Sequence, residues 1–308
     1  MLNPFDKKKA SDFTKSRAPQ NKEEQEEWQA ANKNWWESNP MRYDHRIESI
    51  DGAEYSAEFY DEIDRRFLAS VNEGFPWKKI PFDQFVDFDA LSSQDVLEIG
   101  VGCGTHAQIF ARRSHSYTGI DLTSYAVNAT LKRLKDKGLE GRIVEMDAER
   151  MSFPESSFGF VWSWGVIHHS ADTRAILEEI HRVLKPDGKV VFMVYHQSWW
   201  NTFVRAGLYY GLIRGGLFKG HDVHQLVQLN TDGALARFYT KEELMKDLDE
   251  LFNVSRIDYL GSKHQLIPFG FGPVKVFVSR LIPNVLGRWI TNRPFFAYMQ
   301  VVTCSVVK

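Results

Sequence analysis

A glycine-rich loop that follows an acidic residue is the feature of this chain best suited to bind a ligand. The apolar stretch Val96–Ile99 contains Glu98 and runs into Gly100, Gly102 and Gly104. Glycine lets the backbone turn tightly and lets a ligand approach without a Cβ in the way. Because Glu98 adds negative charge beside the loop, the motif disfavours a phosphate and favours a ligand with a positive charge, an amine or hydroxyls.

A second acidic residue lies at the spacing expected for a nucleoside-binding sheet. The nicotinamide fingerprint G-x-G-x-x-G/A fails, because its last position falls on Thr105. Asp121 ends the next short strand pattern, Ser116–Asp121, 21 residues after Gly100. An acid at the tip of the second strand of a doubly wound sheet meets ribose hydroxyls, and an ionised carboxylate can accept both protons. We predict this role for Asp121, with a helix-capping or turn aspartate as the alternative.

Histidines and a tyrosine at two later strand ends are the groups that could accept a proton. His168 and His169 follow the expected strand Phe158–Trp164, and Tyr195 and His196 end a later one. Histidine titrates near neutrality, so either of the first pair could act as a base. We predict that His168 faces the pocket and that His169 is structural, and we keep Tyr195 and His196 as the next candidates.

The frame for these side chains is an alternation of strand and helix patterns. Such alternation implies an α/β fold with a parallel sheet covered on both faces. Ligands of such sheets bind at the carboxyl ends of the strands, near the point where the strand order reverses. The expected strands lie at 95–99, 116–121, 142–146, 158–164 and 189–195, and the expected helices at 106–113, 123–137 and 172–184. The expected strand-end residues are Glu98, Asp121, Asp147, Trp164 and Tyr195.

Five strings in the segment 95–195 are typical of one enzyme family: LEIGVGCGT, TGID, MDAE, SFGFVWSWGVIHH and RVLKPDGK. The segment resembles the type 11 domain of the class I S-adenosylmethionine (SAM)-dependent methyltransferases. It is also similar to methyltransferases of ubiquinone and menaquinone synthesis. The sequence departs from the family at His106, Gly159 and Asp187, where glycine, aspartate and glycine are often found.

The resemblance implies a fold and a cofactor. The fold is a doubly wound, seven-stranded Rossmann-like sheet whose last strand is antiparallel, with an N-terminal helical extension and a helical cap. The cofactor is S-adenosyl-L-methionine, with Asp147 near the adenine amino group. The expected cofactor-binding residues are Glu98, Gly100, Gly102, Gly104, Asp121, Leu122, Asp147, Ala148, Glu149, Ser163 and Trp164.

The domain organisation follows from changes in pattern along the chain. We expect a mobile tail (1–30), a helical extension or lid (31–90), a SAM-binding core (91–196), a substrate cap (197–239) and a C-terminal part of the sheet (240–308) with an apolar insertion at 266–293. The aromatic segment 35–44 could be a lid over the cofactor, with Arg42 or Tyr43 near its carboxylate, or could simply pack on the sheet edge. Thr240 and Glu243 form the pattern of a helix-capping box.

Segment 266–293 is too long and apolar for an ordinary loop, and we keep three interpretations of it open. It could be an amphipathic helix lying on a membrane surface. It could instead be a second wall of the acceptor pocket, or the contact of a homodimer.

Composition excludes several classes. A net charge of −2 gives no case for nucleic-acid binding, which calls for a basic stripe. Two cysteines without a C-x-x-C pair suggest neither a disulfide framework nor a zinc knuckle, and fit a reducing cytoplasm. The sequence shows no signal-peptide core and no membrane-spanning stretch. We interpret the histidines of 221–224 as exposed cap residues and predict no metal site.

Together these patterns predict a cytoplasmic SAM-dependent methyltransferase that acts on a small organic acceptor, bulky or partly apolar. Methyl transfer from a sulfonium is an in-line SN2 reaction, so a base is needed only if the acceptor is a hydroxyl, a protonated amine or an acidic carbon. A peripheral membrane methyltransferase acting on a quinone or lipid-linked acceptor is the second hypothesis. A non-catalytic SAM-binding partner protein is the third.

Overall fold

The computed structural model describes residues 18–43, 52–270 and 272–307. Its core is a seven-stranded sheet with the order β3-β2-β1-β4-β5-β7-β6. Strand β7 runs antiparallel to both of its neighbours, whereas the remaining pairs are parallel, so the predicted fold is confirmed. The strands are β1 (Asp95–Ile99), β2 (Ser116–Asp121), β3 (Arg142–Glu145), β4 (Phe158–Trp164), β5 (Leu184–Tyr195), β6 (Phe252–Leu260) and β7 (Met299–Val306).

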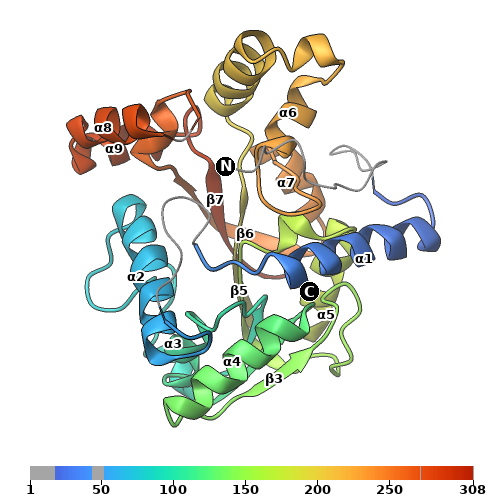
Figure 1. The fold of residues 1–308 in the computed structure, drawn as a ribbon. Helices are drawn as coiled ribbons and strands as arrows, with labels where there is room; N and C mark the ends of the chain where they lie inside the picture. Colours follow the sequence, from blue (N-terminus) through green and yellow to red (C-terminus); the bar gives the residue numbers. More distant parts are fainter. Residues whose placement is uncertain (1–17, 44–51, 271, 308) are drawn as a thin grey trace.

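Helices cover both faces of the sheet and leave its carboxyl edge to other elements (Figure 1). One apolar core contains side chains of α2 (Ala57–Gly74), α3 (Ala107–Ala111) and α4 (Ser124–Asp136). The core on the opposite face contains side chains of α5 (Thr173–Val183) and α7 (Lys241–Leu248). The expected doubly wound arrangement therefore holds.

Helix α5 shows how the sequence specifies these layers. Asp172 caps its first turn by accepting from the backbone N–H groups of Arg174 and Ala175. Its buried side chains recur at helical spacing and pack on the sheet. Each buried leucine, isoleucine or valine contributes roughly 1.5–3 kcal/mol relative to an exposed one. The predicted capping box of Thr240 and Glu243 also forms, at the start of α7.

One local prediction differs from the structure. The helical spacing of Val127, Leu131 and Leu134 predicts that Leu131 lies on the buried face of α4, but it is 42% exposed, and Thr130 and Arg133 are buried instead. The segment 185–188, whose Lys-Pro-Asp-Gly sequence predicts a turn, forms a bulge within β5, since the pairing jumps from Phe158 with Leu184 to Phe160 with Lys189. The insertion 266–293 folds into the two helices α8 (Pro273–Leu281) and α9 (Asn284–Thr291).

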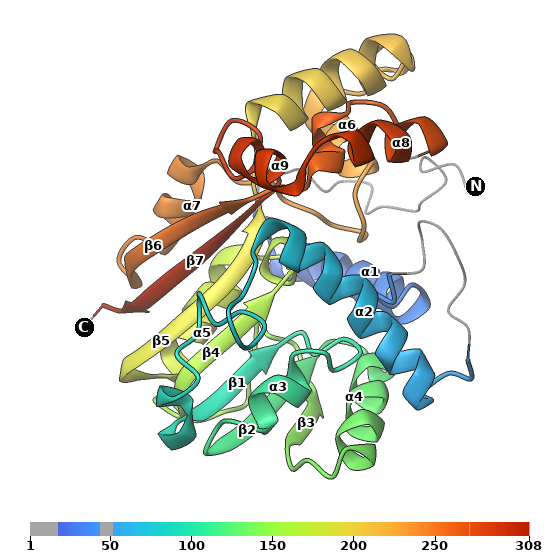
Figure 2. The ribbon, with the colours of Figure 1, turned by 90° about the vertical axis from the view of Figure 1, so that its left-hand side faces the viewer.

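A helical cap lies beyond the carboxyl ends of the strands (Figure 2). It consists of the π-helix η4 (Trp200–Ile213), α6 (Val223–Leu229), α8 and α9. Between them are the short turns η5 (Leu217–Lys219) and η6 (Lys263–Leu266). The first helix, α1 (Lys22–Ser38), also lies at this edge of the sheet. Of the expected mobile tail, residues 1–17 lie outside the described part. No helix among the described residues is long and apolar enough to span a membrane.

Candidate functional site

The three glycines after β1, Gly100, Gly102 and Gly104, differ in what surrounds them. All adopt a positive φ, from 52° at Gly102 to 82° at Gly100, which disfavours any side chain. A Cβ on Gly100 would lie 2.1 Å from the side chain of Val166, and one on Gly104 would meet Arg133 and Thr130 at 3.1 Å. A Cβ on Gly102 would have nothing within 4 Å. Close packing therefore explains the outer two glycines, and Gly102 alone presents its backbone to open space.

Asp121 lies beside that open backbone, at the end of β2. Its Oδ2 accepts from the Gly102 N–H at 3.2 Å, and its Oδ1 accepts from the N–H and the hydroxyl of Thr123 at 3.0 and 2.8 Å. Burial raises the pKa of this carboxyl, and these hydrogen bonds oppose the rise. The structure thus holds the carboxylate in one orientation next to the loop, as the ribose prediction requires.

Glu98 is placed differently from the prediction that it meets the ligand directly. Its side chain is fully buried and accepts from the Tyr117 hydroxyl at 2.6 Å. His106 Nδ1 lies 3.5 Å from its other oxygen, and the ring of Phe82 packs on His106 at 5.0 Å. Because Glu98 is sealed behind these side chains, it can influence a ligand only through its charge or through His106.

The acids after β3 contact helix α1. Asp147 accepts from the Gln29 side-chain amide at 2.8 Å, and Glu149 accepts from the Gln25 amide at 2.7 Å. The amide of Gln29 presents an N–H donor to Asp147, as an adenine amino group would. Asn32 anchors the same helix, since its amide donates to the backbone oxygen of His169 at 2.8 Å. These contacts of α1 were not foreseen, because isolated glutamines and asparagines in a charged helix carry no motif.

The lid interpretation of the N-terminal segment stays a prediction, and the contacts of this segment are compatible with it. Trp28 is buried against Ala171 and Leu235, which fixes α1 across the strand ends. Arg42 pairs with Glu54 at 3.5 Å, and the Sγ of Cys103 in the glycine loop donates to the backbone oxygen of Met41 at 3.9 Å. Tyr43 packs on a phenylalanine of α2.

A buried arginine that sequence reasoning missed holds the glycine loop. Arg133 of α4 is fully buried, donates to the backbone oxygen of Cys103 at 2.9 Å and pairs with Asp64 of α2. Its guanidinium also lies over the Tyr60 ring at 4.9 Å. Nothing in the helical pattern distinguished Arg133 from the exposed basic residues around it, so no signal in the sequence could have identified it.

The histidine pair after β4 is buried. His168 has no exposed surface, which differs from the prediction that it faces an open pocket, and its ring stacks on Tyr195 at 3.8 Å. Burial, reinforced by His169, holds the pKa of His168 well below its usual value, so the ring is neutral near pH 7. His169 Nδ1 lies 2.5 Å from the Leu235 backbone oxygen, which suits the structural role predicted for it.

The two predicted residues at the end of β5 have different surroundings: His196 contacts the backbone, and Tyr195 contacts a residue of a pocket in the cap. His196 directs its two ring nitrogens at the backbone oxygens of Tyr239 and Pro294, at 3.1 and 2.9 Å, and burial lowers its pKa. Those contacts leave no ring nitrogen for a substrate. Tyr195 contacts the ring of Tyr298 at 4.9 Å and so connects His168 to the cap.

Two further predicted cofactor residues, Ser163 and Trp164, lie where β4 ends. Ser163 is fully buried, and its hydroxyl makes no hydrogen bond within the described structure. Trp164 stacks on Trp162 with ring centroids 5.5 Å apart, and the Phe82 ring lies 5.0 Å away. This strand end is therefore a largely aromatic wall. Leu122 and Ala148 follow Asp121 and Asp147 directly in the sequence.

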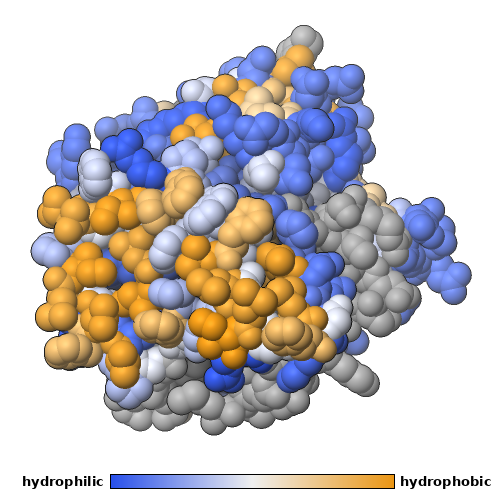
Figure 3. All heavy atoms as spheres, turned by 90° about the horizontal axis from the view of Figure 1, so that it is seen from above, coloured by the Kyte–Doolittle hydropathy of each residue, from blue (hydrophilic) through white to orange (hydrophobic). Residues whose placement is uncertain are grey.

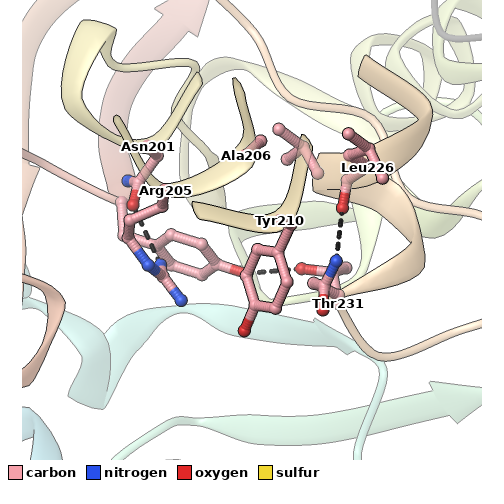
Figure 4. A pocket seen from close by; sticks show the side chains of 9 residues that line it. Asn201, Arg205, Ala206, Tyr210, Leu226 and Thr231 are labelled. Carbon is pink, nitrogen blue, oxygen red and sulfur yellow. Dashed lines mark hydrogen bonds between the residues drawn. The ribbon is translucent and has the colours of Figure 1, made fainter. Parts of the chain in front are cut away.

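A small pocket lies within the cap, between η4 and α6 (Figure 4). Arg205 donates to Asn201 at 2.9 Å, and its Nε is buried without a hydrogen-bond partner. Tyr298 shares a 2.6 Å hydrogen bond with Thr231. The pocket combines a guanidinium, phenols and aliphatic groups. It is lined by Asn201, Arg205, Ala206, Tyr210, Leu226, Val227, Asn230, Thr231 and Tyr298.

The histidines at 221–224 have no metal partners within the described structure. Asp222 caps helix α6 by accepting from the Gln225 backbone N–H at 2.8 Å. Across residues 18–43, 52–270 and 272–307, no group of three or more histidines, cysteines or acids is arranged to hold a metal ion.

Comparison with known proteins agrees with this geometry. A family model described as a methyltransferase domain matches residues 97–192. A demethylmenaquinone methyltransferase of Thermotoga maritima is 28% identical over 236 residues, which cover 73% of this chain and 93% of that protein. The uncharacterized methyltransferase YcgJ of Bacillus subtilis is 32% identical over 102 residues, 33% of this chain, and the chain spans only 40% of that relative.

Among solved structures, a geranyl diphosphate C-methyltransferase of Streptomyces coelicolor A3(2) is similar in fold. The two chains share 13% identity with a TM-score of 0.56, over 94% of this chain and 100% of the other. That enzyme was solved with Mg²⁺, geranyl-S-thiolodiphosphate and S-adenosyl-L-homocysteine.

Proposed function

We propose that this chain, whose residues 97–192 match a methyltransferase domain, is a SAM-dependent enzyme that transfers a methyl group to a small, partly apolar acceptor. The observation that carries this proposal is the Asp121 carboxylate at the end of β2, beside the open backbone of Gly102, with Asp147 just after the neighbouring strand β3.

The residues at the strand ends fit S-adenosyl-L-methionine. Asp121 would hold the ribose hydroxyls, Asp147 would accept from the adenine amino group, and Gly102 would let the amino-acid part approach the backbone. When bound there, the cofactor supplies a methyl group already activated by a positively charged sulfur. The buried charge of Glu98 and the π faces of the wall would favour that positive charge.

The cap pocket, with a free volume of about 20 Å³, would hold one polar end of the acceptor. The buried Nε of Arg205 lacks a hydrogen-bond partner, and an oxygen atom of the acceptor, neutral or anionic, would satisfy it. The rings of Tyr210 and Tyr298 would contact an apolar or aromatic body. Figure 4 shows Arg205 and Tyr210 extending from one helix toward the same side of the pocket. The main task of these side chains is to position the acceptor atom for in-line attack.

For an acceptor that must lose a proton, Tyr195 is the nearest of the four predicted groups to the pocket, because its ring contacts the pocket residue Tyr298. His168 is neutral and fully buried behind the Tyr195 ring, so it has no direct contact with the pocket. The ring nitrogens of His169 and His196 that contact backbone oxygens hold the loop and strand instead. The two buried free cysteines suit a reducing compartment such as the cytoplasm.

A calorimetric titration followed by an activity screen tests the proposal. SAM and its demethylated product should bind, and one or more members of a panel of phenols, quinols, carboxylic acids and amines should be methylated. The variant Arg205→Ala should raise the KM for the acceptor and leave SAM affinity unchanged. Arg214→Ala, an exposed change at the end of the same helix, should alter neither.

Two results would separate the alternatives. Absence of SAM binding would contradict the cofactor assignment itself. Tight SAM binding without turnover on the whole panel would favour a non-catalytic partner protein. A second candidate, an enzyme acting on a quinone or lipid-linked acceptor at a membrane, is favoured by the exposed apolar side chains of the cap.

A further inference from the structure

The cap carries an apolar surface. Its helices expose apolar side chains to solvent and bury polar or small ones. Helix α8 buries Lys275 and Ser279. The side chains that it exposes are Val274, Phe277, Val278 and Leu281, at the i, i+3, i+4 and i+7 positions of one helical face. The exposed fractions of Phe277 and Leu281 are 64% and 67%. An ordinary surface helix turns its apolar face to the core and its polar face to water.

The inward polar groups of α8 are satisfied by the protein, so the helix is not simply misoriented. Lys275 Nζ donates to the backbone oxygens of Ile267 and Phe269 at 3.0 and 3.1 Å, and the Ser279 hydroxyl donates to the Val276 backbone oxygen at 2.8 Å. Turning the helix over would leave the backbone oxygens of Ile267 and Phe269 without the Lys275 donor. The structure thus fixes the apolar stripe of α8 outward.

The two neighbouring helices repeat this pattern. Helix α9 exposes Val285, Leu286 and Trp289 and buries Gly287 and Thr291. A π-helix advances about 4.4 residues per turn, so positions five apart lie roughly on one face. In η4 the outward positions are Phe203, Leu208 and Ile213, and the inward ones are Asn201, Ala206 and Gly211.

These faces lie side by side on the cap. The Trp199 ring stacks on Phe295 at 4.9 Å, the Tyr209 ring contacts Phe269 at 5.8 Å, and Trp200 donates to the Gln265 backbone oxygen at 2.8 Å. Figure 3 shows apolar residues gathered over one side of the molecule in the view from above the cap. We call this the cap face and define it by Trp199, Phe203, Leu208, Leu212, Ile213, Phe218, Phe269, Val274, Phe277, Val278, Leu281, Val285, Leu286, Trp289 and Phe295.

The two segments that contain the cap face carry charges of one sign. Segments 199–219 and 261–298, which contain it, hold eight lysines and arginines and no aspartate or glutamate. Since the whole chain carries −2, the remainder carries −10. Arg214, Lys219, Arg280 and Arg293 are exposed within these segments. The distribution would draw the cap face toward a negative surface and turn the rest of the molecule away from it.

We propose that the cap face docks on an anionic lipid bilayer, with its apolar side chains in the interfacial region and its cations among the lipid headgroups. Outward apolar helices with a basic rim match the chemistry of such a surface. A second copy of this chain would instead place two cationic rims against each other. The docked cap would turn the outer side of η4 to the lipid while Arg205, on the same helix, lines the acceptor pocket, so an amphiphilic acceptor would have a short path to it.

Vesicle co-sedimentation of the full chain tests this inference. We expect pelleting with phosphatidylcholine vesicles that contain phosphatidylglycerol, weaker pelleting with phosphatidylcholine alone, and a loss of affinity as salt is added. The double variant Phe277→Ser/Leu281→Ser should bind the anionic vesicles at least about tenfold more weakly. The matched control Leu131→Ser/Met245→Ser removes exposed apolar side chains outside the cap face and should bind like the unchanged protein.

A second variant and two further measurements make the outcomes distinct. Arg280→Glu/Arg293→Glu changes only exposed charges and should selectively reduce binding to the anionic vesicles. SAM titration of every variant reports folding and the cofactor site, so a failure of the methyltransferase proposal would appear there and not in the pelleting. Absence of pelleting, or a dimer in sedimentation velocity that Phe277→Ser/Leu281→Ser dissociates, would overturn the bilayer proposal.

Discussion

Replacing Gly100 and replacing Gly102 with alanine should have different effects. Gly100 packs closely against Val166, whereas Gly102 faces open space. Gly100→Ala would place a methyl group 2.1 Å from Val166, in addition to the strain of a positive φ. Gly102→Ala meets no neighbour, so its structural cost is limited to the backbone strain of about 1–2 kcal/mol. We expect Gly100→Ala to lower the free energy of unfolding by clearly more than Gly102→Ala, and Gly102→Ala to weaken SAM binding in a protein that still folds.

Denaturant titration and calorimetry on the two variants check this pair. Equal stability losses would contradict the packing role of Gly100. An unchanged SAM affinity in Gly102→Ala would contradict the approach of the ligand at that residue.

Asp121 makes the most direct single-residue prediction for the cofactor. Asp121→Ala removes a charged acceptor of hydrogen bonds, a loss on the order of 1.5–3 kcal/mol in the binding free energy of SAM. Isothermal titration measures it, with Asp136→Ala on α4 as a control that removes an aspartate distant from the loop. Equal affinities for Asp121→Ala and the unchanged protein would refute the ribose assignment.

The buried His168 predicts how stability depends on pH. Its folded-state pKa lies well below the unfolded value of 6.5, because burial disfavours the charged ring. Its neutral form therefore supports the fold above pH 6.5, and this contribution is lost as the pH falls from 6.5 toward the folded pKa. The unchanged protein should lose unfolding free energy more steeply over that interval than His168→Phe.

The buried carboxyls act in the opposite direction, since burial raises the pKa of Asp121 and of Glu149. Their effect is common to both proteins and cancels in the difference between them. Denaturant unfolding at a series of pH values gives the comparison, with exposed His115→Phe as the control. Parallel curves for the unchanged protein and His168→Phe would show that His168 does not titrate as its burial implies.

At the scale of elements, α1 acts as a cover anchored by a few polar contacts. Asn32→Ala would leave the backbone oxygen of His169 buried without its donor, a cost of about 1–3 kcal/mol. We expect faster proteolysis within α1 and faster release of SAM. Asn34→Ala, an exposed change two residues further along the same helix, should alter neither rate. If limited proteolysis and stopped-flow release do not distinguish the two variants, α1 is not held by this contact.

The sequence predicted the elements whose pattern reflects a single physical cause, either burial of apolar side chains or a local capping motif. The parallel strands are continuous apolar runs, and the capping box at Thr240 is a local motif, so β4 and α7 could be placed closely. The cap could not be placed in this way, because its helices bury polar side chains and expose apolar ones. A prediction that assigns apolar residues to the core places these helices the wrong way round. For the same reason it does not predict that Arg133 is buried.

For the site, the sequence indicated which residues gather at the strand ends, but it did not indicate which side chains cover them. Asp121 lies by the glycine loop as predicted, whereas Glu98 and His168 are sealed behind aromatic side chains. Those covers come from Phe82 and Tyr195, and Gln29 on Asp147 comes from a segment 118 residues away in the chain. Contacts between such distant segments depend on how the whole chain packs, which no local spacing records.

At the scale of the molecule, the sheet edge and the cap offer different chemistry. The sheet edge offers carboxylates and an open glycine, and the cap offers a guanidinium, phenols and an outward apolar face. Ring contacts connect His168, after β4, through Tyr195 to Tyr298 of the cap pocket. Under the proposed function, a polar, charged cofactor and a partly apolar acceptor would approach each other from these two sides.

The central claim is that the adenosyl group of SAM lies across the tips of β1, β2 and β3. A crystal structure of the protein with S-adenosyl-L-homocysteine tests this most directly. We predict ribose hydroxyls on Asp121, the adenine amino group on Asp147 in place of the Gln29 amide, and the amino-acid part beside Gly102. A ligand bound elsewhere, with Gln29 still on Asp147, would contradict the account.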